Sequence, residues 1–445
     1  MLRGLEYWLV VGICLTCAMH LWQFDFGLRM TFAELLVVAF ILIRIVSLIK
    51  SEARVIFDKR LEKLSLWYFV LWVLGAMTAI IVLKNADSDL AWRQYFRYMI
   101  SDLAYSVFAI LFARFAAEIG AAKCKRLVGL YVYATIASCM FELAEVSLGK
   151  WFGIDLLRIV FEPISFNARI FDQETLLLEW GDFYRGSGFA GPNAQGAYIA
   201  SAVTLMILGF GPKRATIKYG AIILALIAQA ITMSRTGLLV LISGALALLV
   251  LHRHRLIYAI PGTVLVAGTL VCLYLMFASE ADELALTRSG MDYSRLELFQ
   301  GALEIAKANA FGIGVGQYFV LFWQGHDLAF DANVHNTWLQ ILVEKGWLGL
   351  GLSVGFYVFL LLQLGRIPLR SGKAGFATIL GLMAGSLTST FFTLLFPRFC
   401  TILLFCHAVV DDAEQRRKQE KVGLQSEVLD SKHPMAHRRA PAARK

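Results

Sequence analysis

Four arginines lie at the ends of apolar segments. Arg185 precedes the segment GSGFAGPNAQGAY, Arg235 lies in MSRTG between two apolar runs, and Arg288 and Arg295 bracket SGMDYS. Arginine carries a permanent charge and a planar fork of donors that matches phosphate oxygens. The four side chains together predict a binding site for a diphosphate. The alternative is that each arginine pairs with a nearby carboxylate or reaches lipid headgroups.

The segment that follows Arg185 predicts a turn into a helix. Its glycines permit a tight backbone, and Pro192 and Asn193 close the turn before an apolar run. The side chain of Asn193 can cap that helix, and the free amides of the first turn can hold an anion. An ordinary loop-to-helix turn is the alternative.

One histidine has surroundings that suit proton transfer. His335 opens the motif HNTWLQILVEKGWLG, with Asn333 before it, Asn336 after it and Gly346 as the end of a short helix. An imidazole at a helix start can accept a proton from a hydroxyl near neutral pH. We therefore predict His335 as a candidate base, with Asn333 and Asn336 contacting the acceptor or supporting the histidine. A capping or interfacial role for His335 is the alternative.

The composition places these residues in a membrane protein. Of the 445 residues, 58% are hydrophobic and only 17% are charged, whereas soluble domains carry about 45–50% apolar and about 25% charged residues. This excludes a soluble enzyme, a disordered chain and a disulfide-stapled domain. The seven cysteines show no zinc-ligand spacing, so no metal site is expected.

Apolar windows predict an all-α polytopic membrane protein with about twelve spanning helices. The predicted spans are 5–22, 30–49, 65–84, 100–118, 127–148, 196–211, 219–233, 237–252, 256–279, 347–365, 374–394 and 396–410. Arg44 lies inside the second span and is expected to extend its charge toward the interface.

Most of the lysines and arginines lie in short loops and in the tail, and one set of alternate loops is basic: 54–63, 123–126, 213–218, 253–255 and 366–373. The positive-inside rule places these loops and both termini in the cytoplasm. The net charge of +9 is therefore a topology signal, and no nucleic-acid partner is expected.

The chain then divides by position relative to the membrane. Spans one to five occupy 1–148, spans six to nine 196–279, and spans ten to twelve 347–410, while 149–195 and 280–346 are long outer loops. Loops of this length are usually functional. Leu296, Phe299, Ala302, Leu303 and Ala306 predict an amphipathic helix in the second loop, and GIGVG at 312–316 predicts a turn after it. The tail, 411–445, is polar and expected to be disordered.

The order of these motifs resembles the bacterial O-antigen ligase and polysaccharide polymerase superfamily. The order is GSGFAGPN, SRTG, an amphipathic helix ending in FGIGVG, and HNTWLQILVEKGWLGL, over roughly residues 180–360. The resemblance implies a twelve-helix glycosyltransferase of the GT-C type with a helical periplasmic cap, in the bacterial inner membrane. It implies a metal-independent enzyme without a cofactor that takes a glycan from undecaprenyl diphosphate. The family's essential arginines and histidine match Arg235, Arg295 and His335, and Arg185, Arg288 and Asn193 are further candidates for holding the diphosphate.

The resemblance leaves the acceptor open. A polymerase transfers the glycan to another lipid-linked repeat unit, whereas a ligase transfers it to lipid A core. The predicted outer loops contain few lysines, which favours a polymerase because a lipid A core acceptor should need a broad basic surface. Proteins that set chain length or export the polysaccharide are possible further partners. A twelve-helix transporter is a distant alternative, since no paired half-repeat is visible.

Overall fold

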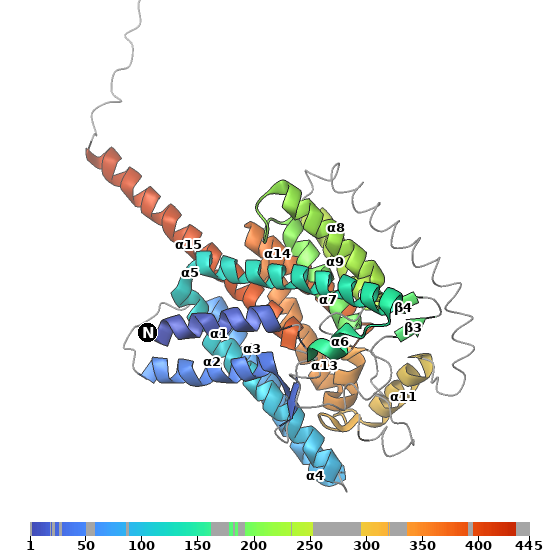
Figure 1. Cartoon of the computed structure of the whole chain (residues 1–445). Coiled ribbons are helices and arrows are strands. Elements are labelled where there is room, and N and C mark those ends of the chain that lie inside the picture. The colour runs from blue at the N-terminus through green and yellow to red at the C-terminus, as the bar shows by residue number, and fades with distance from the viewer. Residues whose placement is uncertain are drawn as a thin grey trace, which may run out of the picture.

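The computed structural model is built almost entirely of helices (Figure 1). It describes residues 2–17, 19, 23–25, 29–49, 58–85, 89–161, 178–180, 183–185, 192–232, 234–251, 295–318, 320, 336–389 and 395–432. The helices of the first half are α1 (Leu2–Thr16), α2 (Phe32–Ile49), α3 (Lys59–Met77), α4 (Ala79–Asn85), α5 (Asp89–Phe152) and α6 (Leu156–Phe161). Those that follow are α7 (Pro192–Ile207), α8 (Ala215–Ile231), α9 (Arg235–Leu251), α11 (Arg295–Ala308), α13 (Thr337–Gly365), α14 (Arg370–Gly385) and α15 (Leu395–Lys432).

Two short antiparallel ribbons depart from the all-α prediction. Strand β1 (Gln23–Asp25) pairs with β2 (Arg29–Thr31), and β3 (Leu178–Trp180) pairs with β4 (Phe183–Arg185). Each strand has three residues, which is too short for the alternating pattern that reveals a strand in a sequence. The prediction of a mostly helical protein is nevertheless confirmed.

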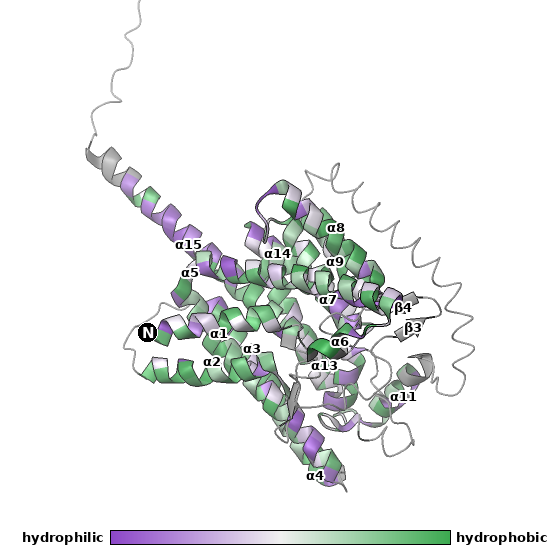
Figure 2. Cartoon of the chain, viewed as in Figure 1, coloured by the Kyte–Doolittle hydropathy of each residue, from purple (hydrophilic) through white to green (hydrophobic). Residues whose placement is uncertain are grey.

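The described helices have the length and surface of a membrane protein. Four are long and apolar enough to cross a bilayer, namely α2, the α3–α4 pair, α5 and α13, and α8 and α9 are shorter apolar helices. Large hydrophobic side chains such as Trp8, Ile49 and Ile80 are more than two-thirds exposed, and Figure 2 shows hydrophobic residues along the outer helices. The predicted span 256–279 lies outside the described residues, so the total of twelve and the relation to the GT-C fold stay predictions.

Helix α5 joins two predicted spans through a break. Gly120 has φ 77° and ψ 170°, a conformation that only glycine adopts readily. The break leaves the amides of the next helical turn without partners. The Glu414 carboxylate accepts the Ala121 N–H at 2.8 Å and thereby caps the second half of α5.

Glu414 belongs to a segment that was expected to be disordered. Helix α15 instead continues from the last predicted span to Lys432 and projects from the bundle (Figure 1). The segment 411–432 is rich in strong helix formers, and its Arg416 pairs with Asp412 four residues earlier, at 3.0 Å. The prediction of disorder was therefore wrong up to Lys432, and residues 433–445 lie outside the described residues.

The base of α15 is also tied to the start of α3. The Arg60 guanidinium donates to Asp412 at 2.7 Å and to Asp58, the N-cap of α3, at 2.8 Å. Burial on its own would raise the pKa of the Asp58 carboxyl, but the hydrogen bonds from Arg60 outweigh it and hold that pKa below its usual value.

Arg44 differs from its predicted role. Its side chain is 1% exposed and pairs with Glu6 at 3.3 Å and with Glu118. It therefore does not extend to the interface. A buried charge is tolerated when it is paired, and the three side chains join α2, α1 and α5. Phe40, one turn before Arg44, packs edge-on against Phe108 and Phe115 in the apolar core of the same helices.

A second break divides α13 and is filled by the GIGVG turn. Gly346 has φ 68° and ψ −171°, so the helix that begins at Thr337 ends there, as predicted. The carbonyls of Val343 and Glu344 lose their helical partners at this break. The amides of Ile313 and Gly314 donate to them at 2.9 and 3.0 Å.

Close backbone contact explains the glycines at this junction. A Cβ on Gly346 would lie 2.3 Å from the Ala310 carbonyl oxygen, and one on Gly312 would lie 2.5 Å from the Glu344 carbonyl oxygen. Gly312 also has φ 81°. The GIGVG prediction is confirmed as a turn after the amphipathic helix, and the turn holds the two halves of α13 at a fixed angle.

Gly346→Ala should therefore destabilise the protein, because the methyl group meets the Ala310 carbonyl and alanine is strained at this φ and ψ. The expected loss is on the order of 1–3 kcal/mol, measured by thermal unfolding of the purified protein in detergent. Gly351→Ala, on the same helix, is the matched control. No atom of the described residues lies within 4 Å of a Cβ added there, so the substitution should be neutral or slightly stabilising. Equal effects of the two substitutions would show that the junction does not constrain α13.

Candidate functional site

Arg235 begins helix α9 at the tip of a tight hairpin. Ser234 caps this helix: its hydroxyl accepts the Gly237 N–H at 3.1 Å and its carbonyl accepts the Leu238 N–H at 3.0 Å. Ser234 is 4% exposed, whereas Arg235 is exposed. The cap therefore anchors the hairpin tip while the arginine side chain stays accessible.

The start of α7 lies directly against the start of α9. The Ser234 hydroxyl donates to the Asn193 side-chain oxygen at 3.4 Å. A Cβ on Gly237 would lie 2.6 Å from the backbone of Gly196, so the two helices touch through glycines. Asn193 is the second residue of α7 and not its cap, because its side chain turns across to α9. The predicted capping role was wrong, and the contact with Ser234 brings the starts of α7 and α9 together. That Asn193 and Arg235 hold one ligand stays a prediction.

The start of α13 joins the same group through the turn that follows α14. Asn336 is the N-cap of α13 and accepts the Leu339 N–H at 3.0 Å. Thr337 donates its backbone N–H to the Ser386 carbonyl at 2.9 Å and its hydroxyl to the Ser389 carbonyl at 2.8 Å. These bonds fix the beginning of α13 on the 386–389 turn.

The same turn also holds the start of α9. The hydroxyls of Thr236 and Thr388 are 3.0 Å apart and share a hydrogen bond. One connected set of contacts therefore runs from Asn193 through Ser234 and Thr236 to Thr388, and from the turn to Thr337. Three helices begin at this end of the bundle, and helix starts carry a partial positive charge. The Gly237, Thr337 and Leu339 amides are already bonded within the protein. With Arg235, the helix starts form a region suited to an anion.

Helix α11, which begins at Arg295, packs against the short helix 337–345. Ala302, Ala306, Leu339 and Val343 are buried in one cluster between α11 and α13. The amphipathic helix is confirmed, except that Leu303 is 43% exposed and does not belong to the buried face. Arg295 is the first residue of α11, but its side chain is not among those described.

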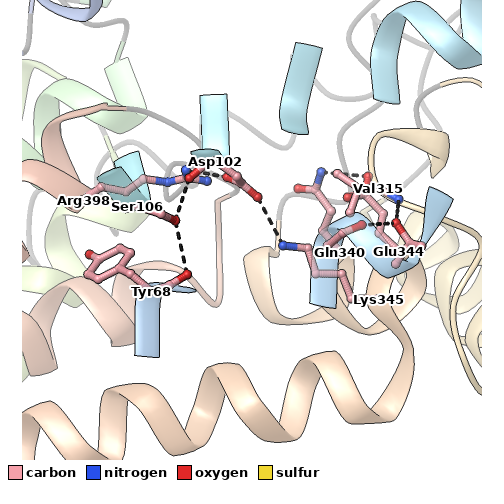
Figure 3. Close-up of polar contacts among 10 residues, drawn as sticks. Tyr68, Asp102, Ser106, Val315, Gln340, Glu344, Lys345 and Arg398 are labelled. Carbon is pink, nitrogen blue, oxygen red and sulfur yellow. Dashed lines mark hydrogen bonds and ion pairs between the residues drawn. The ribbon is translucent and has the colours of Figure 1, made fainter. Parts of the chain in front are cut away.

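A charged network braces the short helix 337–345 from the other side (Figure 3). Asp102 on α5 accepts from Lys345 at 3.3 Å and from Arg398 on α15 at 2.6 Å. The Arg398 guanidinium also lies 4.6 Å from the centroid of the Tyr105 ring. These residues were not singled out from the sequence, although an acidic residue inside an apolar span is a recognised signal. They hold α5, α13 and α15 together beside the candidate site.

Several predicted site residues are not placed. His335, Asn333 and Arg288 lie outside the described residues, and Arg185 is described only as the last residue of β4. Of the eight predicted residues, Asn193, Arg235 and Asn336 are on helix starts that contact one another or the same turn. In the described part of the chain, no group of three or more His, Cys, Asp or Glu residues could hold a metal ion.

Fold and site together define a helical membrane protein with a polar, positively charged region at one end of its bundle. Residues 220–354 match the family model described as O-antigen ligase. The match confirms the resemblance to the O-antigen ligase superfamily and supports a membrane glycosyltransferase of the ligase and polymerase type. It contains Arg235, Arg288, Arg295 and His335, whereas Arg185 and Asn193 precede it. No curated protein matches the chain.

The Thr236–Thr388 bond should couple two helix starts measurably. In a double-mutant cycle, Thr236→Val and Thr388→Val should show a coupling free energy of unfolding of about 0.5–1.5 kcal/mol, the net value of a typical hydrogen bond. Thr378→Val on α14 is the control, because its buried hydroxyl has no hydrogen-bond partner among the described residues and its loss should be neutral or stabilising. Additive effects of the two valine substitutions would contradict the bond.

Proposed function

We propose that this protein transfers a glycan from undecaprenyl diphosphate to an acceptor hydroxyl at the periplasmic face of the bacterial inner membrane. The observation that carries the proposal is the contact set from Asn193 to Thr337, which gathers three helix starts and Arg235 at one end of the bundle. A diphosphate needs such a concentration of N–H donors and positive charge.

The proposed donor site holds the diphosphate by its charge. Arg235, Arg295, Arg185 and Arg288 bind the phosphate oxygens, and the amides at the start of α7, with Asn193, add hydrogen bonds. The same groups stabilise the negative charge that develops as the diphosphate leaves, which is electrostatic catalysis in a partly dehydrated site. The lipid chain extends into the bilayer beside the apolar helices.

The proposed chemical step is a displacement at the anomeric carbon. The acceptor oxygen forms a bond to this carbon while the bond to the diphosphate oxygen breaks, and undecaprenyl diphosphate leaves. His335 takes the proton of the acceptor hydroxyl. Asn333 and Asn336, its neighbours in the sequence, orient the acceptor or the histidine. Asn336 already caps α13 through its side chain, which supports a positioning role for it.

We propose a repeat unit of a surface polysaccharide as the acceptor, so that the enzyme is a polymerase. The small number of lysines in the predicted outer loops supports this choice. Lipid A core is the second candidate acceptor, favoured by the description of the matching family as O-antigen ligase. A deletion strain distinguishes the two. Single repeats on the cell surface without long chains indicate a polymerase, whereas lipid-linked long chains that accumulate indicate a ligase.

The transferase proposal is tested with purified protein and undecaprenyl-diphosphate glycan. Release of undecaprenyl diphosphate that depends on an acceptor supports it. Movement of the intact lipid-linked glycan or of a solute without bond cleavage would support the transporter alternative and contradict the proposal.

In this assay, Arg235→Lys and Arg295→Lys should each lose most of the turnover. Lysine retains the charge but lacks the planar fork that binds two phosphate oxygens at once. Each loss should reach about tenfold or more, since a hydrogen bond to a charged group contributes roughly 1.5–3 kcal/mol. Arg366→Lys, an exposed arginine at the other end of α13, should retain full activity. Near-normal turnover of both site variants would show that Arg235 and Arg295 contribute only positive charge and do not bind two phosphate oxygens at once.

His335→Ala should lower turnover by about 10²–10⁴ while leaving donor binding largely intact, because a positioned base acts on the rate. Wild-type activity should fall as the pH drops below about 6.5, the ordinary pKa of histidine, since the protonated imidazole cannot accept a proton. His335→Gln retains a hydrogen-bonding group but cannot act as a base. If glutamine restores most of the activity that alanine loses, His335 orients the hydroxyl and does not deprotonate it.

A further inference from the structure

A polar cavity of about 250 Å³ lies at the other end of the bundle. Its lining comes from the break in α5, the end of α7, the start of α14 and the base of α15. The candidate site lies instead at the start of α7 and just after the end of α14. Helix α7 has 16 residues, so roughly 24 Å separate the two regions. The cavity is therefore distinct from the proposed donor site.

Three basic side chains from three different helices line this cavity. They are Lys125 on α5, Arg370 at the start of α14 and Lys418 on α15. All three residues are exposed, and no carboxylate among the described residues forms a salt bridge with them. The Lys125 Nζ atom lies 6.0 Å from the centroid of the Phe210 ring. This cation–π contact does not neutralise the charge of the lysine. The cavity thus has cations from separate elements that are free to bind an anion.

The two carboxylates of the cavity are already engaged with protein donors. Asp411 accepts the Ser371 hydroxyl at 2.6 Å, and Glu414 accepts the Ala121 N–H at 2.8 Å. Three cations and two carboxylates leave the lining with a net charge of +1 when His407 is neutral. This net positive charge attracts an anion, and a single negative charge is enough to neutralise it.

His407 supplies a second, independent indication of a ligand. It lines the cavity, its side chain is only 2% exposed, and its Nδ1 atom has no hydrogen-bond partner among the described residues. The ring is held edge-on against Phe210, with ring centroids 5.7 Å apart. Buried polar atoms usually have partners, so an unpaired nitrogen in a cavity rimmed by cations suggests that a bound molecule supplies one.

We infer that this cavity binds the phosphodiester of a membrane phospholipid headgroup. A phosphodiester carries a single negative charge, which matches the net charge of the lining. Its oxygens can accept hydrogen bonds from Lys125, Arg370 and Lys418, and the headgroup can reach the His407 nitrogen. Leu208 and Phe210 add an apolar border at the end of apolar helix α7, where the glycerol and the first methylene groups of a lipid would lie.

The test uses the full-length protein, purified in detergent and stripped of lipid. Dihexanoyl phosphatidylglycerol is titrated while the midpoint of thermal unfolding is followed, and native mass spectrometry counts the bound lipid. Arg370→Gln and Lys418→Gln should each weaken binding roughly tenfold, because each removes a charge-assisted hydrogen bond. Both side chains are exposed, so the variants should fold normally. Lys421→Gln is the matched control: it removes an exposed charge from the same helix α15, outside the cavity lining.

Three outcomes would overturn the inference. The first is equal binding by the wild type and the two cavity variants, and the second is an equal loss in Lys421→Gln, which would indicate general attraction to a basic surface. The third is stabilisation by inorganic phosphate at concentrations as low as those of the lipid, which would indicate a site for free phosphate. None of these outcomes involves glycan transfer, so they test the lipid site independently of the proposed function.

Discussion

The junction between the GIGVG turn and the break in α13 is the constraint on which the candidate site depends. A helix that ends inside a bilayer protein leaves carbonyls that need donors. The turn supplies two amides to Val343 and Glu344, and Trp347 returns its own N–H to Ala310 at 3.1 Å. The backbones approach so closely that side chains are excluded at Gly312 and Gly346. The short helix 337–345 is thereby set apart from the spanning half of α13, and its first residues can reach the 386–389 turn.

The rest of the site is built by placing helix starts side by side. Each start carries partial positive charge, so three of them at one end of the bundle would repel one another if nothing held them. Neutral hydrogen bonds hold the three starts together. They join Ser234 to Asn193, Thr236 to Thr388, and Thr337 to the turn. Because these three bonds use hydroxyls and amides and no carboxylates, they add no negative charge of their own to the region.

The sequence predicted the helices, the break at Gly346 and the amphipathic helix well, because each has a local signal in periodicity or glycine placement. Three features depended on contacts between distant segments and could not be predicted in this way. Glu414 caps α5 at Ala121, 293 residues away; Arg44 is paired inside the bundle; and Asn193 bonds to Ser234 instead of capping its own helix.

The helical continuation of α15 had a local signal, its helix-forming composition, but the polar character of the segment suggested disorder. The bond between Ser234 and Asn193 and the connecting turn at 386–389 were not anticipated, because both join segments that are distant in the sequence.

The distribution of charge along the central helices bears on what kind of membrane protein this is. Helix α7 contains no charged residue, α9 contains only Arg235 at its start, and α14 contains only Arg370 and Lys373 at its start. These three helices pack on one another and connect the candidate site to the opposite cavity. A secondary carrier needs ionisable groups near the midplane to bind a coupling ion or substrate on its way across. Here the charges of these helices lie at their ends, and the stretch between them consists of apolar and small residues with neutral polar side chains such as Thr204, whose hydroxyl is bonded to the Ala200 carbonyl at 3.0 Å. These three helices therefore do not supply midplane charges, although Asp102 and Arg398 form an ion pair between α5 and α15.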